Sequence, residues 1–151
     1  MAKKKGELKG FDLGYKVVKI NTTKFSYSDL EEDKVAFLFE DEENLIVSLE
    51  ANMGISLEKA EIFFEIHTLL SDRKKNESII SHIGKTTFSI QNLKYAFHEE
   101  HKKFDFPDGF VVQLYALSYS HARALLSVEL SRTAYKDLFY LPVIDPTKIL
   151  E

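Results

Sequence analysis

The feature that most constrains the fold is the recurrence of apolar residues at every second position in two successive stretches. In residues 45–53 every odd position is apolar, and residues 60–67 carry apolar side chains at every even position. Side chains alternate between the two faces of a strand, so each pattern predicts a strand with one buried face. Gly54 lies between the two stretches and indicates a turn region there.

Two further stretches complete a set of four predicted strands. Residues 15–27 are rich in Val, Ile, Thr and aromatic residues, without glycine or proline. Residues 79–90 are interrupted by Gly84, which predicts a bulge or a bend. The polar residues 71–77 are typical of the hairpin loop that joins the third and fourth strands.

The C-terminal half predicts helices. Residues 93–103 are expected to form a short helix, and residues 110–136 one long helix that follows the turn residues at 105–109. Residues 146–151 could begin a final helix. The predicted fold class is α+β: a four-stranded antiparallel sheet followed by one long helix and a short C-terminal helix.

Composition excludes several classes of protein. The formal net charge is −4, which argues against a nucleic-acid-binding protein. The absence of cysteine excludes disulfides and thiolate-bound zinc. The longest apolar run, 35–39, is far too short to span a membrane, so we expect no membrane insertion and a soluble, cytoplasmic protein. Residues 1–10 are predicted to be a disordered basic arm, and residues 11–151 a single domain.

No convincing catalytic constellation is found. The pair His98 and His101 lacks the spacing of a zinc-protease motif, and an exposed helical face explains it better than a metal site. Ser120 and His121 are adjacent on a predicted helix, so their side chains diverge, and no nucleophile-elbow motif surrounds them. We therefore expect a non-enzymatic protein without metal or cofactor.

The stretch from Ser120 to Asp145 resembles the long helix and exit segment of the SecB family of protein-export chaperones. That family carries an Ala-Arg pair, then Ser-Arg, then a segment with Leu, Pro, Val and Asn or Asp. The matching residues here are Ala122-Arg123, Ser131-Arg132, Leu141-Pro142-Val143 and Asp145. The order of the strands upstream is also that of the family, so the resemblance extends over about residues 15–150.

The resemblance implies an ATP-independent holdase that binds unfolded polypeptides, including preproteins on their way to export. It also implies a homotetramer built as a dimer of dimers. In the family the client groove lies between the crossover after the first strand and the final helix. The residues at those positions are Val35, Phe37, Leu38, Phe39, Leu141, Val143, Ile149 and Leu150.

Two observations on the residues bear on this assignment. Residues 35–39 form an apolar island between two acidic runs, outside the alternating strands; a fifth buried strand or a loop anchor is the alternative interpretation. The predicted long helix carries an apolar stripe wider than one sheet face needs, which favours contact with a second subunit. That stripe comprises Val111, Leu114, Leu117, Ala124, Leu125 and Val128, and it is widened by Ala122, Leu126 and Leu130.

One partner of the family is in doubt, and two alternative functions stay open. Family members that dock on the SecA motor present acidic residues where this chain has Lys24, Ser28 and Ser81, so docking on SecA is doubtful. Residues 91–109 are also longer than the family's usual connection, and the chain could be a dedicated interaction module, such as a SecB-like chaperone of a toxin–antitoxin system. A carrier of a small apolar ligand is the second alternative.

Overall fold

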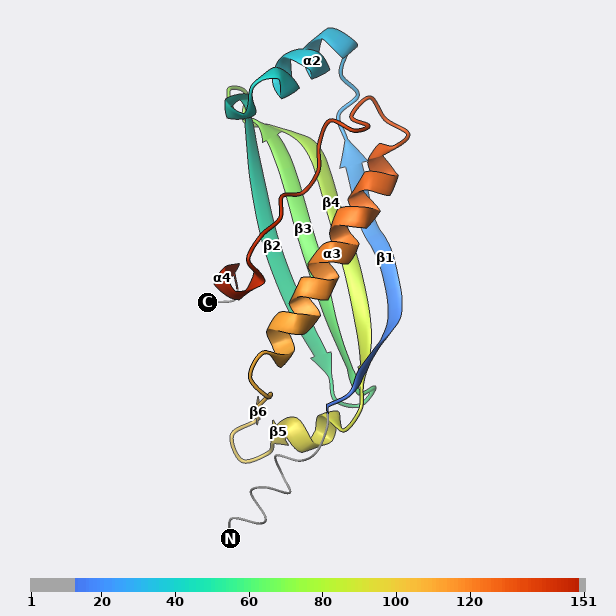
Figure 1. The fold of residues 1–151 in the computed structure, drawn as a ribbon, viewed down its shortest axis with the longest axis vertical. Coiled ribbons are helices and arrows are strands. Elements are labelled where there is room, and N and C mark those ends of the chain that lie inside the picture. The colour runs from blue at the N-terminus through green and yellow to red at the C-terminus, as the bar shows by residue number, and fades with distance from the viewer. Residues whose placement is uncertain (1–12, 150–151) are drawn as a thin grey trace.

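A computed structural model describes residues 13–149, which form a four-stranded antiparallel sheet with one long helix across one face (Figure 1). The strands are β1 (Tyr15–Tyr27), β2 (Leu45–Ser56), β3 (Glu61–Asp72) and β4 (Glu77–Ile90). Their order in the sheet is β1-β4-β3-β2, so β1 and β2 are the two edges. The helices are α2 (Glu32–Glu40), the long α3 (Phe110–Leu130) and the short α4 (Pro146–Ile149). The predicted α+β class is confirmed; the predicted basic arm lies outside the described residues.

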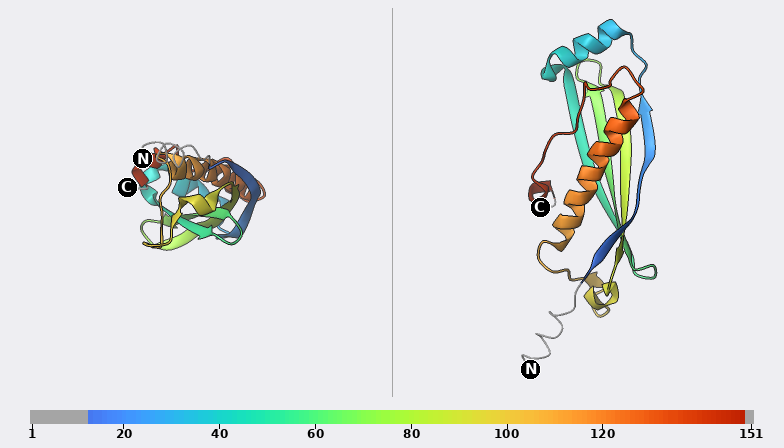
Figure 2. Two further views of the ribbon diagram at one scale, coloured as in Figure 1. Left: turned by 90° about the horizontal axis from the view of Figure 1, so that it is seen from below. Right: turned by 45° about the vertical axis from the view of Figure 1, so that its right-hand side comes forward.

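The core lies between α3 and the sheet. Helix α3 packs chiefly on β4, β3 and β1, and it leaves the edge strand β2 largely uncovered (Figures 1 and 2). Strand β3 turns alternate, mostly apolar side chains toward the helix, which is the pattern that the sequence predicts for it. The fully buried members of this core include Ile62, Phe64, Ile66, Leu70, Ile80, Phe88, Leu114, Ala122 and Leu126.

Gly84 allows the close approach of α3 to the sheet. A Cβ atom placed on Gly84 would lie 3.1 Å from the Cβ atom of Ala122. The irregularity that was predicted at Gly84 lies across from it, where the pairing of β1 with β4 shifts between Thr22 and Lys24. Gly84 and Ala122 together therefore set the spacing between the helix and the sheet.

Substituting Gly84→Val is expected to lower the free energy of unfolding by about 1–3 kcal/mol, because the added side chain forces α3 away from the sheet. The control is Thr87→Val on the opposite face of the same strand, which should change stability by less than about 0.5 kcal/mol. Urea unfolding of both variants measures the difference. A Gly84→Val protein as stable as the parent would show that α3 does not lie this close.

The structure corrects two predictions for the C-terminal half. Residues 93–103 are not a helix: a 3-10 turn, Leu93–Ala96, leads into a two-stranded hairpin of β5 (Phe97–His98) and β6 (Lys103–Phe104). The rings of Phe97 and Phe104 lie 4.9 Å apart, and this cross-strand aromatic pair stabilises the hairpin against a helix. His98 and His101 therefore do not share a helix face.

The long helix ends at Leu130 rather than at Lys136. The hydroxyls of Ser131 and Thr133 donate hydrogen bonds to the carbonyls of Val128 and Leu130, at 2.6 and 2.9 Å. These side chains satisfy carbonyls of the last turn and compete with continuation of the helix. No helix among residues 13–149 is long and apolar enough to cross a membrane.

The apolar island at 35–39 is part of helix α2, so it is neither a strand nor a loop. Val35 and Leu38 are three positions apart, lie on one face of the helix and are buried. After α2, a short 3-10 turn, η1 (Glu42–Asn44), leads directly into β2. Helix α2 therefore spans one end of the sheet, between the end of β1 and the start of β2 (Figure 1).

Candidate polypeptide-binding surface

The eight residues that the sequence assigns to a groove occupy three kinds of environment. Val35, Leu38 and Leu141 are buried at 3, 5 and 1% exposure, and Phe39 is half-buried. Phe37 and Val143 are exposed, at 54 and 82%. Ile149 ends α4, but its side chain and Leu150 lie outside the part of the chain that the structure describes.

Helix α2 is fixed by its buried face. The ring of Phe39 lies 5.9 Å from the ring of Tyr135, which also donates a hydrogen bond to the carbonyl of Ser28 at 2.5 Å. Burial raises the pKa of the Tyr135 hydroxyl, so this group keeps the proton that it donates. Phe37 points away from these contacts, and its backbone carbonyl accepts a hydrogen bond from Asn44 Nδ2 at 3.0 Å.

The segment after α3 is tied back to the helix. Tyr119 donates its hydroxyl hydrogen bond to the carbonyl of Pro142 at 2.6 Å, and Arg123 Nε donates to the carbonyl of Leu141 at 3.0 Å. Leu141 is buried between them, whereas Tyr140 and Val143 are exposed. Three of the residues that resemble the SecB family, Arg123, Leu141 and Pro142, thus hold this segment in place.

The edge strand β2 carries a partly uncovered apolar strip, which we call the β2 strip: Val47, Leu49, Ala51 and Met53. Their partners on β3 include Leu70, Ile66 and Phe64, which are core residues, so the strip lies on the face of the sheet that α3 covers. Because α3 packs chiefly on the other three strands, Val47 and Met53 remain 42 and 44% exposed. The C-terminal segment runs along the same side of α3 toward β2 (Figures 1 and 2).

The β2 strip is not among the binding residues that the sequence predicts. Alternation predicts that β2 has one buried face, and the structure confirms that these residues share a face. Alternation does not reveal where the covering helix ends, and that is what leaves Val47 and Met53 exposed. The sequence also does not reveal that these residues lie on an edge strand, because the order of strands in a sheet is a property of the tertiary fold.

Two other surfaces are apolar and exposed. On the edge strand β1, the exposed side chains include Val17, Val18 and Ile20. On α3, Val128 is 67% exposed, and Arg123 and Glu129 are its only charged residues. The stripe predicted for this helix is divided between two sides. Its buried members are Leu114, Ala122, Leu126 and Leu130, and Val111 and Leu117 pack against the core. Ala124 and Val128 are exposed on the outer side.

The buried His82 and the half-buried His121 each contact a threonine hydroxyl, His82 within the sheet and His121 between α3 and the sheet. His82 Nε2 lies 3.0 Å from Thr22 Oγ1, and His121 Nδ1 lies 3.0 Å from Thr86 Oγ1. Burial lowers the pKa of His82 to about 4 and lowers the pKa of His121. In residues 13–149 no three His, Cys, Asp or Glu side chains lie close enough to hold a metal ion.

Comparison with known proteins gives a structural similarity. No protein-family model matches the sequence, and no curated protein matches it. Among solved structures, the chain is similar to the Mycobacterium tuberculosis Rv1957 SecB-like chaperone in complex with a ChAD peptide from the Rv1956 HigA1 antitoxin. The TM-score is 0.49 at 8% sequence identity, and the alignment covers 86% of this chain and 89% of that one.

Proposed function

We propose that this protein is an ATP-independent holdase that binds unfolded polypeptide segments along β2. The observation that supports it is the combination of an apolar strip and a sheet edge on one strand. The backbone groups on the outer side of an edge strand are free to bond to another extended chain. The exposed side chains of the β2 strip offer apolar area beside them.

The size of this surface suits weak and unselective binding. From Val47 to Met53 the strand covers about 20 Å, which six or seven residues of an extended client would match. Each 100 Å² of apolar surface removed from water contributes about 2.5 kcal/mol. Ordering the client offsets much of this gain, so a single segment binds weakly and a long unfolded chain is held through several contacts.

We include in the proposal a homotetramer, arranged as a dimer of dimers. Two exposed apolar surfaces support self-association: the edge of β1 and the outer side of α3 around Val128. A role in preprotein export is the finer part of the proposal. Docking on SecA should be weak, since Lys24 is exposed on β1 and the hydroxyl of Ser28 bonds to the carbonyl of Ser78.

The paired substitution Val47→Thr with Met53→Gln is expected to weaken the holding of clients severalfold. It removes apolar area from the β2 strip, while both sites are more than 40% exposed, so the cost in stability should stay below about 1 kcal/mol. The assay is suppression of aggregation of a slowly folding protein during its refolding, with the melting temperature of each variant measured in parallel.

The control is Leu69→Gln on β3, which removes a similarly exposed apolar side chain from the opposite face of the sheet. It should leave holding unchanged. Equal loss in both variants would mean that the strip has no special role. Binding of one folded partner at fixed stoichiometry, without general suppression of aggregation, would favour the dedicated interaction module instead.

A further inference from the structure

The hollow beneath α2 has a chemistry that the β2 strip lacks. We propose that it binds an acidic side chain of the client, so that segments with a carboxylate near their apolar stretch are held in preference to neutral or basic segments. This inference rests on the proposed function and adds a charge selectivity to it.

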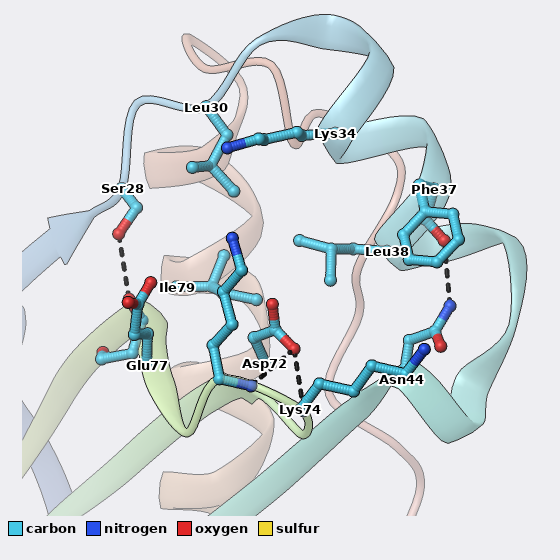
Figure 3. Close-up of a pocket in the computed structure, with 12 residues that line it drawn as sticks. Ser28, Leu30, Lys34, Phe37, Leu38, Asn44, Asp72, Lys74, Glu77 and Ile79 are labelled. Carbon is cyan, nitrogen blue, oxygen red and sulfur yellow. Dashed lines mark hydrogen bonds between the residues drawn. The ribbon is translucent and has the colours of Figure 1, made fainter.

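The hollow lies between α2 and the turn that joins β3 to β4, and its volume is about 240 Å³ (Figure 3). Leu30, Leu38 and Ile79 give it an apolar wall. Lys34 reaches it from α2, and Lys74 and Lys75 reach it from the turn. Cations from two separate elements thus meet over an apolar wall.

The hydrogen bonds within the wall use the backbone of the lysines and not their side-chain ammonium groups. Asp72 Oδ1 accepts hydrogen bonds from the backbone amides of Lys74 and Lys75, at 3.0 and 3.4 Å. Glu77 is the other carboxylate that lines the hollow. Between residues 13 and 149 the single ion pair is formed by His98 and Asp105, so none of the three lysines has a carboxylate within 4 Å.

Charge complementarity selects the occupant. The acidic residues of α2 and η1, such as Glu32 and Glu43, do not line the hollow. Its three lysines face the two carboxylates of Asp72 and Glu77, which leaves an excess of one positive charge. An Asp or Glu side chain fits this volume, and the apolar wall strengthens its attraction to the lysines by lowering the local dielectric constant. Lys74 Nζ already lies 5.9 Å from the ring centroid of Phe37, so an apolar neighbour of the carboxylate can pack beside Phe37.

The hollow and the β2 strip are within reach of one client segment. Asn44 lines the hollow and directly precedes β2. Val47 follows three residues later, about 10 Å along an extended strand. A peptide with its acidic residue three to five positions from its apolar stretch can therefore occupy both.

The test uses three fluorescent peptides of one apolar sequence that carry Glu, Gln or Lys at a position four residues from the apolar stretch. Binding to the full chain is measured by fluorescence anisotropy. We expect the Glu peptide to bind about twofold to fivefold tighter than the Gln peptide, with the Lys peptide weakest. Salt at about 0.5 M should remove most of the difference, since it screens exposed charges.

The variant Lys34→Gln with Lys75→Gln should abolish the preference for Glu and leave the affinity for the Gln peptide unchanged. The matched control, Lys136→Gln with Lys148→Gln, makes the same change in net charge at exposed sites away from the hollow and should keep the preference. Equal binding of all three peptides to the parent protein would overturn this inference alone. A preference that survives Lys34→Gln with Lys75→Gln would overturn it as well. If none of the peptides binds, the proposed function fails and this inference fails with it.

Discussion

Lowering the pH from 7 to 4 is expected to reduce the free energy of unfolding by about 3 kcal/mol through the side chain of His82 alone. His82 is fully buried on β4, and burial lowers its pKa from the usual 6.5 to about 4. Its Nδ1 atom is buried without a hydrogen-bond partner, so no group within the described residues stabilises a second proton on the ring. The folded protein therefore holds His82 neutral at a pH where the unfolded chain protonates it.

The direction of the effect follows from proton binding. Between pH 6.5 and 4 the unfolded state binds more protons at this site than the folded state, so stability falls as the pH falls through this window. Above pH 6.5 the contribution is constant. The reduced pKa of His121, also caused by burial, acts in the same direction.

Urea unfolding of the parent protein and of His82→Gln, at several pH values between 4 and 7.5, isolates the contribution of His82. The amide keeps a polar group near Thr22 and does not titrate in this range. The parent should lose about 3 kcal/mol more than His82→Gln across the window. Parallel pH profiles for the two proteins would show that His82 is protonated as readily in the folded state as in the unfolded chain.

Substituting Leu38→Ala is expected to lower the free energy of unfolding by about 2–5 kcal/mol, whereas Phe37→Ala should change it by less than about 0.5 kcal/mol. These adjacent residues of α2 differ in burial: Leu38 is 5% exposed and Phe37 is 54% exposed. Leu38→Ala removes a contact that holds α2 against the sheet and leaves a cavity there. Phe37→Ala removes only exposed surface at the rim of the hollow.

Phe37→Ala should also weaken the holding of clients, since Phe37 adds apolar area where a client segment would pass from the hollow beneath α2 to the β2 strip. Thermal unfolding and aggregation suppression of the two variants measure both effects. A large loss of stability on Phe37→Ala would place this side chain in the core, possible only if another subunit covers it. Unchanged holding together with unchanged stability would remove α2 from the client path.

The strands could be predicted because their signal is local. Alternation in residues 45–53 and 60–67 is written in neighbouring residues, and the observed β2 and β3 extend these stretches by a few residues. Helix α2 could not be predicted in this way, since only Val35 and Leu38 are buried in its nine residues and they make less than two turns of periodic pattern. The hairpin of β5 and β6 was missed because its stabilising contact joins Phe97 and Phe104, which the sequence separates by a turn.

The candidate site shows the same division. The resemblance to the SecB family predicted binding residues on α2 and in the segment after α3. It did not distinguish the buried residues that fix these segments from the exposed residues. Leu141 is an anchor because hydrogen bonds from Tyr119 and Arg123 hold its segment against α3, and Val143, two residues later, is exposed. The β2 strip depends on where α3 ends across the sheet, which is decided by packing over distant residues. The lysines of the hollow come from α2 and from the turn after β3, which the chain separates by β2 and β3.

Backbone hydrogen exchange with and without an unfolded client tests the central claim most directly. If a client segment adds to the sheet along β2, amides of residues 45–56 that do not bond to β3 should exchange more slowly when the client is bound. The amides of β4, which is paired on both sides by β1 and β3, should not change. Slowed exchange in residues 45–56 and around Val143 would be the predicted result. Slowed exchange confined to β1, or to the face of the sheet opposite α3, would contradict the account.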